Sequence, residues 1–274
     1  MPRPLRMSAP GMALALAVLA ALGAGAFNSR SRADETREVE IERMTSPEVA
    51  AALAQGSTTI IIPTGGTEQN GPHMVLGKHN FIVAETARRI ARKLGNALVA
   101  PVIAYVPEGD IAGREGHMAY PGTISVPPAV FAAVLENAAA SFRAHGFKTI
   151  VLLGDSGPNQ GPQHEVAEAL TKAWAKEGVR VIHAGTYYAA NGGEAWLEGQ
   201  GETKAQIGTH AGIRDTSELM AVYPGGIRAG KMAPNEKGVV GDPARASTER
   251  GEKLLSLKVD AAVHDIAEGL KTEP

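Results

Sequence analysis

A carboxylate and two histidines lie close together in the stretch TEQNGPHMVLGKHN, which covers Thr67–Asn80. Glu68, His73 and His79 are residue types that bind borderline divalent ions such as Zn²⁺ or Mn²⁺. The same side chains could instead perform acid–base chemistry, or Glu68 could accept hydrogen bonds from the backbone of a polar loop. The spacing within this stretch leaves these interpretations open.

A second candidate is Asp155, in the sequence LLGDSGPNQ that follows an apolar run. A serine nucleophile at Ser156 would need the pattern G-x-S-x-G around it. Pro158 stands where that pattern has its last glycine. The sequence therefore favours a metal-binding, substrate-binding or loop-structuring role for Asp155 over a nucleophilic Ser156.

A third group, His210, Asp215 and Glu218, precedes the apolar run Leu219–Val222. Asp215 or Thr216 could simply cap a helix that begins here, which is the alternative to a functional role. Capping does not explain His210, which therefore remains a candidate functional residue.

His117 and Tyr120 lie in a fourth stretch, EGHMAYPGTISV, which is typical of a structured loop before a helix. The loop is interpreted either as a turn or as one wall of a substrate site. The remaining histidines have no converging partners in the sequence and are interpreted as structural or solvated: His145, His164, His183 and His264.

Segments with helical spacing or helix end signals alternate with short β-branched runs along the chain. The expected helices cover residues 45–56, 80–95, 127–147 and 164–178. The expected strands cover residues 57–66, 97–106, 148–157 and 179–188. This alternation predicts an α/β fold, with a parallel sheet that carries helices on both faces.

The order of these elements also predicts where the candidate residues meet. In open α/β sheets, ligands bind beyond the carboxyl ends of the strands. The stretches that contain Glu68 and Asp155 each follow an expected strand. These stretches and the His210 segment are therefore expected to converge on one rim of the sheet.

The composition excludes several other functions. The chain has 274 residues, a formal net charge of -2 and 4% aromatic residues, which argues against a nucleic-acid binder. It has no cysteine, so disulfides, thiol nucleophiles and cysteine-bound metals are excluded, and any metal needs His, Asp, Glu, Asn or backbone oxygen ligands.

The N-terminus has the features of a secretory signal peptide, assigned to about residues 1–30. Arg3 and Arg6 precede the apolar run Gly11–Leu22, and Ala24-Gly25-Ala26 fits a small-x-small cleavage pattern. The alternative is an uncleaved membrane anchor. We expect an exported, periplasmic or secreted protein without stable membrane insertion after cleavage, with one domain over residues 40–274.

In order, these segments resemble the creatininase (creatinine amidohydrolase) family. EQNGPHMVLGKH, Glu68–His79, aligns without gaps with the family motif Glu-Gln-His-Gly-Pro-His-Leu-Pro-Leu-Gly-Thr-Asp. YPGTISV matches a Pro-Gly-Thr segment, THAGIRDTS matches His-Ala-Gly-x-x-Glu-Thr-Ser, and GDSGPN falls where the family has Asn-Gly-His-Gly-Gly-Asn. The resemblance implies a three-layer α/β/α sandwich with a mostly parallel central sheet, a homo-oligomer, and two divalent metals that activate water to hydrolyse a cyclic amide or similar C–N bond.

Several family ligand positions carry other residues in this chain. Glu68, His73 and His210 are retained, and Asp215 replaces a glutamate. Asn70 stands for a histidine ligand, His79 for the bridging aspartate, Ser156 for a histidine and Asp155 for a glycine. We expect Glu68, His79, Asp155 and Asp215 to hold one or two ions of Zn or Mn.

The expected function is a metal-dependent amidohydrolase acting on a small molecule, with Asp155, His210 or Asp215 as general base. The expected substrate-binding residues are Asn70, His73, His117, Tyr120 and Ser156. The main alternative is a non-catalytic exported protein that binds a small molecule on the same fold. A metal-free acid–base enzyme that uses Asp155 with Ser156 or His210 is a third reading.

Overall fold

The computed structural model describes residues 37–271, so the expected signal peptide lies outside the described residues. From Val39 onward, the chain packs as one compact unit. Among the helices of this described part, none combines the length and the apolar character that crossing a membrane would require.

A parallel four-stranded sheet forms the centre of the fold, with the order β2-β1-β3-β4. Each neighbouring pair is parallel, and Ile60 of β1 lies in register with Leu98 of β2 and Ile150 of β3. The strands are β1 (Thr59–Thr64), β2 (Ala97–Val99), β3 (Thr149–Gly154) and β4 (Arg180–His183).

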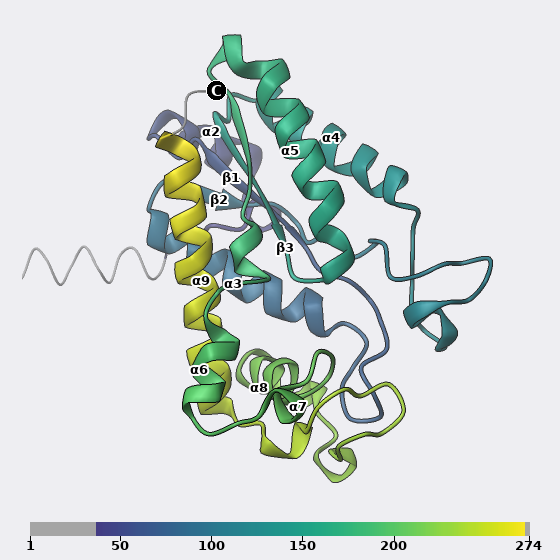
Figure 1. Cartoon of the computed structure of the whole chain (residues 1–274). Helices are drawn as coiled ribbons and strands as arrows, with labels where there is room; N and C mark the ends of the chain where they lie inside the picture. Colours follow the sequence, from purple (N-terminus) through teal and green to yellow (C-terminus); the bar gives the residue numbers. More distant parts are fainter. Residues whose placement is uncertain (1–36, 272–274) are drawn as a thin grey trace, which may run out of the picture. The chain divides into compact units, whose positions relative to one another are not determined.

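Helices cover both faces of this sheet because its strands are buried on both sides. Ile60 and Ile62 point into one hydrophobic cluster, and Ile61 points into the other. The first cluster packs under α2 (Ser46–Ala54), α4 (Pro128–Ala144) and α5 (Gln160–Trp174). The second packs under α3 (Lys78–Leu94) and α9 (Thr248–Lys271); in Figure 1, α9 lies on the other side of the strands from α4 and α5. The expected three-layer α/β/α sandwich is confirmed.

Three further helices lie beyond the carboxyl ends of the strands, in the lower part of Figure 1. They are α6 (Gly193–Gly199), α7 (Lys204–Ile207) and α8 (Ile213–Val222). Helix α8 packs against α9 and α3, so the polar segments after the strands are enclosed by the C-terminal half of the chain. Short 3-10 helices complete the described elements: Ile41–Arg43, Gly116–Ala119, Gly157–Asn159, Ala175–Glu177, Gly185–Tyr187, Pro224–Gly226, Ala229–Lys231 and Pro243–Arg245.

Several element boundaries differ from the sequence expectation; for example, α5 begins at Gln160 rather than at residue 164, and β4 ends at His183 rather than at residue 188. The expected strand 97–106 ends at Val99, shortly before Pro101, whose missing N–H cannot extend a strand ladder. Helix α3 begins at Lys78 rather than at residue 80, with Gly77 as its N-cap. Lys78 and His79 therefore belong to the first turn of a helix, and both are buried.

Candidate active site

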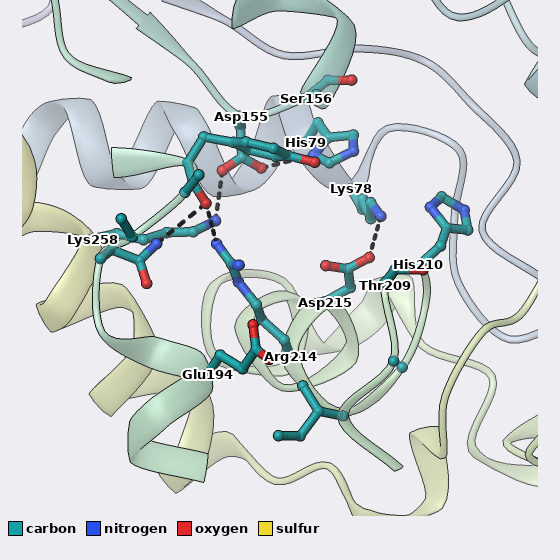
Figure 2. A pocket seen from close by; sticks show the side chains of 18 of the residues that line it. Lys78, His79, Asp155, Ser156, Glu194, Thr209, His210, Arg214, Asp215 and Lys258 are labelled. Atoms are coloured by element: carbon teal, nitrogen blue, oxygen red, sulfur yellow. Dashed lines mark hydrogen bonds and ion pairs between the residues drawn. The ribbon is translucent and has the colours of Figure 1, made fainter. Parts of the chain in front are cut away.

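A cavity of about 830 Å³ opens at the carboxyl ends of β1 and β3. Glu68 lines it from the segment after β1, and Asp155 and Ser156 line it from the end of β3. Helices α6 and α8 and the segments beside them form the opposite wall, which includes His210 and Arg214. The expected convergence of segments on one rim of the sheet is thus present, and Figure 2 gives a close view of the cavity.

Glu68 is the centre of the polar cluster in this cavity and is only 2% exposed. Its Oε1 atom lies 2.8 Å from Nε2 of His79 and 3.5 Å from Nζ of Lys78. Its Oε2 atom lies 3.0 Å from Nε2 of His117. Burial alone would raise the pKa of Glu68, but the charges of Lys78 and His79 hold it well below its usual range. Glu68 is therefore a carboxylate with different partners on its two oxygens.

His79 joins two carboxylates through its two ring nitrogens. Nε2 lies 2.8 Å from Glu68, and Nδ1 lies 2.8 Å from Oδ2 of Asp155. Burial and the charge of Lys78 would lower the pKa of His79, but the two carboxylates raise it to about 9. At neutral pH the ring is an imidazolium that donates from both nitrogens.

Asp155 is buried and accepts hydrogen bonds on both oxygens. Besides His79, it accepts from the hydroxyl of Tyr187 at 2.8 Å and from Nζ of Lys258 at 2.7 Å. Burial would raise its pKa, but Lys258 and His79 lower it to about 2. Lys258 also donates to Oε2 of Glu218 at 2.6 Å. Asp155 is therefore an ionised carboxylate whose two oxygens both accept hydrogen bonds from the protein.

Lys78 and Asp215 form a second ion pair, with Nζ 2.5 Å from Oδ2. The same oxygen accepts from the backbone N–H of Ala211 at 2.8 Å. Ala211 has φ of +55°, a strained conformation for a residue with a Cβ, and it lies between His210 and the start of α8. Burial would raise the pKa of Asp215, but the charge of Lys78 holds it far below its usual range.

The rings of His210 and His117 pack against each other beside Glu68, with centroids 4.6 Å apart and planes tilted by 40°. Nε2 of His210 donates to the backbone oxygen of Gln69 at 2.9 Å, which leaves Nδ1 facing Oε1 of Glu68 at 3.7 Å. Burial and the charge of Lys78 lower the pKa of His210 to about 4. Burial also lowers the pKa of His117. Both rings are neutral imidazoles near neutral pH, the state in which histidine binds metals.

Among the described residues, the acidic and histidine side chains whose ligand atoms converge are Glu68, His117 and His210, within 4.8 Å of one another. This set differs from the expected ligands. Glu68 is shared, but Asp155 and Asp215 are paired with lysines, and His79 has no ring nitrogen left for an ion. Nδ1 of His117 lies 3.2 Å from the amide nitrogen of Gln69, so an ion would have to take the place of the contact between Nε2 of His117 and Glu68. Neutral imidazoles with one carboxylate form a suitable site for Zn²⁺ or Mn²⁺, so a potential metal site is present here.

Ser156 adds a second polar contact near Glu68. Its hydroxyl donates to Oε2 of Glu108 at 3.3 Å, and both side chains are buried. Burial and the neighbouring charge of Glu68 raise the pKa of Glu108 to about 8. Ser156 therefore lines the cavity with its hydroxyl hydrogen bonded to a carboxyl group that is neutral at pH 7.

Three of the expected substrate-binding residues do not line the cavity, in contrast to His117 and Ser156. Asn70 is buried and donates to the backbone oxygens of Glu68 and Val75, so it shapes the loop. His73 is buried against the hydroxyl of Thr216, 3.0 Å from Nε2. Tyr120 lies outside the cavity wall and packs under the ammonium group of Lys237. Hydrogen bonds within the loop account for Asn70, and the contact with Thr216 of α8 accounts for His73.

Sequence reasoning missed Lys258, Tyr187 and Glu108. Lys258 had a detectable signal, because it lies on the apolar face of α9 between Leu255 and Ala262, where a lysine needs a buried partner. Tyr187 and Glu108 gave no comparable pattern, since their partners are far away along the chain.

Comparison with known proteins identifies the lineage of this chain. It is 27% identical over 248 residues to the mycofactocin precursor peptide peptidase of Mycobacterium tuberculosis (strain CDC 1551 / Oshkosh), which spans 80% of this chain and 88% of the relative. It is 22% identical over 262 residues to creatinine amidohydrolase of Pseudomonas putida, and the match covers 87% of this chain and 98% of the relative.

Solved creatininase structures share the fold. One described as creatininase Mn superposes with a TM-score of 0.70, and a mutant creatininase of the Zn-Zn type superposes with 0.69. Each is 22% identical and covers 86% of this chain and all of the other. The family description, creatinine amidohydrolase, matches residues 42–266. The chain therefore belongs to the creatininase family.

Proposed function

We propose that this protein is a hydrolase that cleaves a cyclic amide or a related C–N bond of a small molecule bound in the cavity. Family membership supports the hydrolase class. The observation that carries the proposal is the convergence of Glu68, His117 and His210 at the cavity, with both imidazoles neutral. The relatives include a peptide peptidase and a creatinine amidohydrolase, and both names describe cleavage of C–N bonds.

The donor set fits one divalent ion, Zn or Mn. Nδ1 of His210 and Oε1 of Glu68 are two acceptors that face each other at 3.7 Å, and a neutral imidazole supplies no proton between them. A cation satisfies such a pair. When bound, a divalent ion supplies an activated water and polarises the carbonyl of the substrate. Glu68, His117 and His210 would hold it.

The protein itself supplies charge and orientation around this centre. Lys78 lines the cavity and gives one N–H to Asp215, so it presents positive charge where a substrate oxygen becomes negative during attack. Asp215 fixes the Lys78 ammonium, and Gln69 fixes the tautomer of His210 through its backbone oxygen. Asp155 and Asp215 are positioning residues in this proposal, because Asp155 holds His79, Tyr187 and Lys258, and Oδ2 of Asp215 holds Lys78 and the N–H of Ala211.

The test is a hydrolysis assay on creatinine, lactams, cyclic ureides and short peptides, with Zn²⁺ or Mn²⁺ and with a chelator. We expect turnover of at least one cyclic amide, lost with chelator and reduced about 10²–10⁴-fold in His210→Ala and His117→Ala. His264→Ala is the matched control, because His264 is exposed on α9 away from the cavity. Circular dichroism checks that each variant is folded.

Three outcomes would overturn this assignment. Activity that persists with chelator and in both histidine variants would show that no metal at Glu68, His117 and His210 is needed for the reaction. Cleavage of peptides alone would show that the substrate is a peptide and not a small cyclic amide. Absence of turnover across the panel, combined with calorimetric binding of one member, favours the alternative of a non-catalytic small-molecule-binding protein.

Export and assembly are also proposals. The first 30 residues support a periplasmic or secreted location, which cell fractionation of the tagged chain tests. A homo-oligomer is expected from the family, and light scattering of the purified protein measures it.

A further inference from the structure

We propose that the ammonium group of Lys78 stands in for a second metal ion, so that this chain binds a single divalent ion. The inference rests on the metal centre proposed above and concerns its nuclearity. A relative of the Zn-Zn type provides the contrast, because its description names two zinc ions.

Lys78 occupies a place between two carboxylates that would suit a cation. Its Nζ atom lies 2.5 Å from Oδ2 of Asp215 and 3.5 Å from Oε1 of Glu68, and the side chain is only 1% exposed. Figure 2 shows Lys78 and Asp215 pointing toward each other beside His210. A divalent ion on these same oxygens would lie in contact with the ammonium, and like charges at that distance repel strongly.

His79 removes the other route to a second ion. Position 79 corresponds to an aspartate that bridges two metals in the family motif, whereas an imidazole cannot bridge them in the same way. Both ring nitrogens of His79 are hydrogen bonded, to Glu68 and Asp155 at 2.8 Å each. A metal ion at either nitrogen would therefore have to displace one of these two carboxylates.

The remaining carboxylates near the cavity are also neutralised by the protein. Lys258 lies 2.7 Å from Asp155 and 2.6 Å from Glu218, and Nε of Arg214 lies 3.3 Å from Glu218. Four acidic groups thus meet four basic ones: Glu68, Asp155, Asp215 and Glu218 with Lys78, His79, Arg214 and Lys258. Within the described residues, Asp155, Asp215 and Glu218 thus each already have a lysine ammonium within 3 Å, in the place that a second dication would take.

Glu68 faces the proposed metal ligands with both oxygens. Oε1 faces Lys78, His79 and, at 3.7 Å, Nδ1 of His210, whereas Oε2 faces His117 at 3.0 Å. Lys78 therefore already supplies positive charge at Oε1, beside the place proposed for the ion. A second dication there would meet the repulsion of both the ammonium group and the first ion.

The experiment counts bound ions per chain after equilibrium dialysis of the purified full-length protein against ZnCl₂ or MnCl₂, by plasma mass spectrometry. We expect one ion in the wild type, none in His117→Ala or His210→Ala, and two in Lys78→Met. Lys93→Met is the matched control, because Lys93 pairs with Asp260 on the exposed surface, and it should keep one ion. Melting temperature with and without metal gives a second readout, and we expect a larger metal-dependent rise in Lys78→Met than in the wild type.

The outcomes separate this inference from the proposed function. Two ions in the wild type, or one ion in Lys78→Met, overturn the inference and leave the metal centre standing. No ion in the wild type overturns both the metal centre and the inference, because the inference states that the wild type binds one ion. If Lys78→Met does not fold, Lys78→Thr, which restores the residue of the family motif, is measured in the same way.

Discussion

The ammonium nitrogen of Lys258 lies 2.7 Å from Oδ1 of Asp155, although the two residues are 103 positions apart in the sequence. The same nitrogen lies 2.6 Å from Glu218, and all three side chains are at most 3% exposed. Lys258→Met removes the charge that two buried carboxylates share. We expect a loss of about 3–5 kcal/mol in the free energy of unfolding, measured by urea denaturation.

Lys253→Met is the control for this substitution, because Lys253 lies on the exposed side of the same helix. Its effect should stay within about 0.5 kcal/mol. Equal effects at positions 253 and 258 would contradict a structural role for the buried ion pairs.

Tyr187→Phe tests the neutral donor of the same cluster. The hydroxyl of Tyr187 donates to Asp155 and lies 2.8 Å from the hydroxyl of Thr86, in a fully buried position. Loss of a hydrogen bond to a charged group should cost about 1.5–3 kcal/mol in urea denaturation. Tyr105→Phe, at an exposed tyrosine, should change stability little, and a neutral result for Tyr187→Phe would show that Asp155 does not depend on this donor.

At Gly251, the backbone of α9 lies close against α8. A Cβ at this position would lie 1.9 Å from the backbone oxygen of Ser217, so the helices would have to separate. We expect Gly251→Ala to destabilise the protein by at least 1–3 kcal/mol and to lower its melting temperature. Gly199→Ala, at a helical glycine with open space around its Cβ position, should be neutral or slightly stabilising. Tolerance of both substitutions would contradict tight α8–α9 packing.

His183 should contribute to acid sensitivity. Burial and the neighbouring His164 of α5 lower its pKa to about 4, despite Asp265 of α9, and its ring donates to Gln160 at 3.0 Å. The folded state disfavours the charged ring, so the unfolded state binds more protons between about pH 4 and 6.5. The contribution of His183 to the free energy of unfolding is therefore fully present above pH 6.5 and is lost as the pH falls from 6.5 to 4. After allowing for solvent screening, the loss is about 1–2 kcal/mol.

Urea denaturation at pH 7 and pH 4.5 measures this effect. His183→Gln should reduce the difference in stability between the two pH values. His264→Gln, at an exposed histidine, should leave the difference as it is in the wild type. The assignment fails if both variants keep the full difference.

Local signals in the sequence predicted the fold well. Thr45 and Glu48 form a capping box at the start of α2, and the two residues are only three positions apart in the sequence. The run Thr59–Thr64 forms the buried strand β1, as its β-branched residues and the Pro and Gly that end it indicate. These interactions depend on residues a few positions apart, which a single sequence shows directly.

The site was harder to predict because its pairings are tertiary. His117 was expected beside the substrate, but nothing in the sequence places it 3.0 Å from Glu68. His79 was expected to bind metal, whereas two carboxylates instead hold it as an imidazolium. The choice between those roles depends on where Asp155 and Lys258 come to lie, and that is set by packing across the whole chain.

Helix α9 supplies Lys258, and this has a consequence for the order in which the molecule matures. Residues 59–183, which contain the four strands, are synthesised before residues 248–271. Domains begin to organise as the chain emerges from the ribosome, so the sheet can assemble while Asp155 has no ammonium partner. The cavity is then completed late, when α9 packs against the sheet and brings Lys258 to Asp155. A chain that stops before residue 248 should contain the sheet but not the complete pocket.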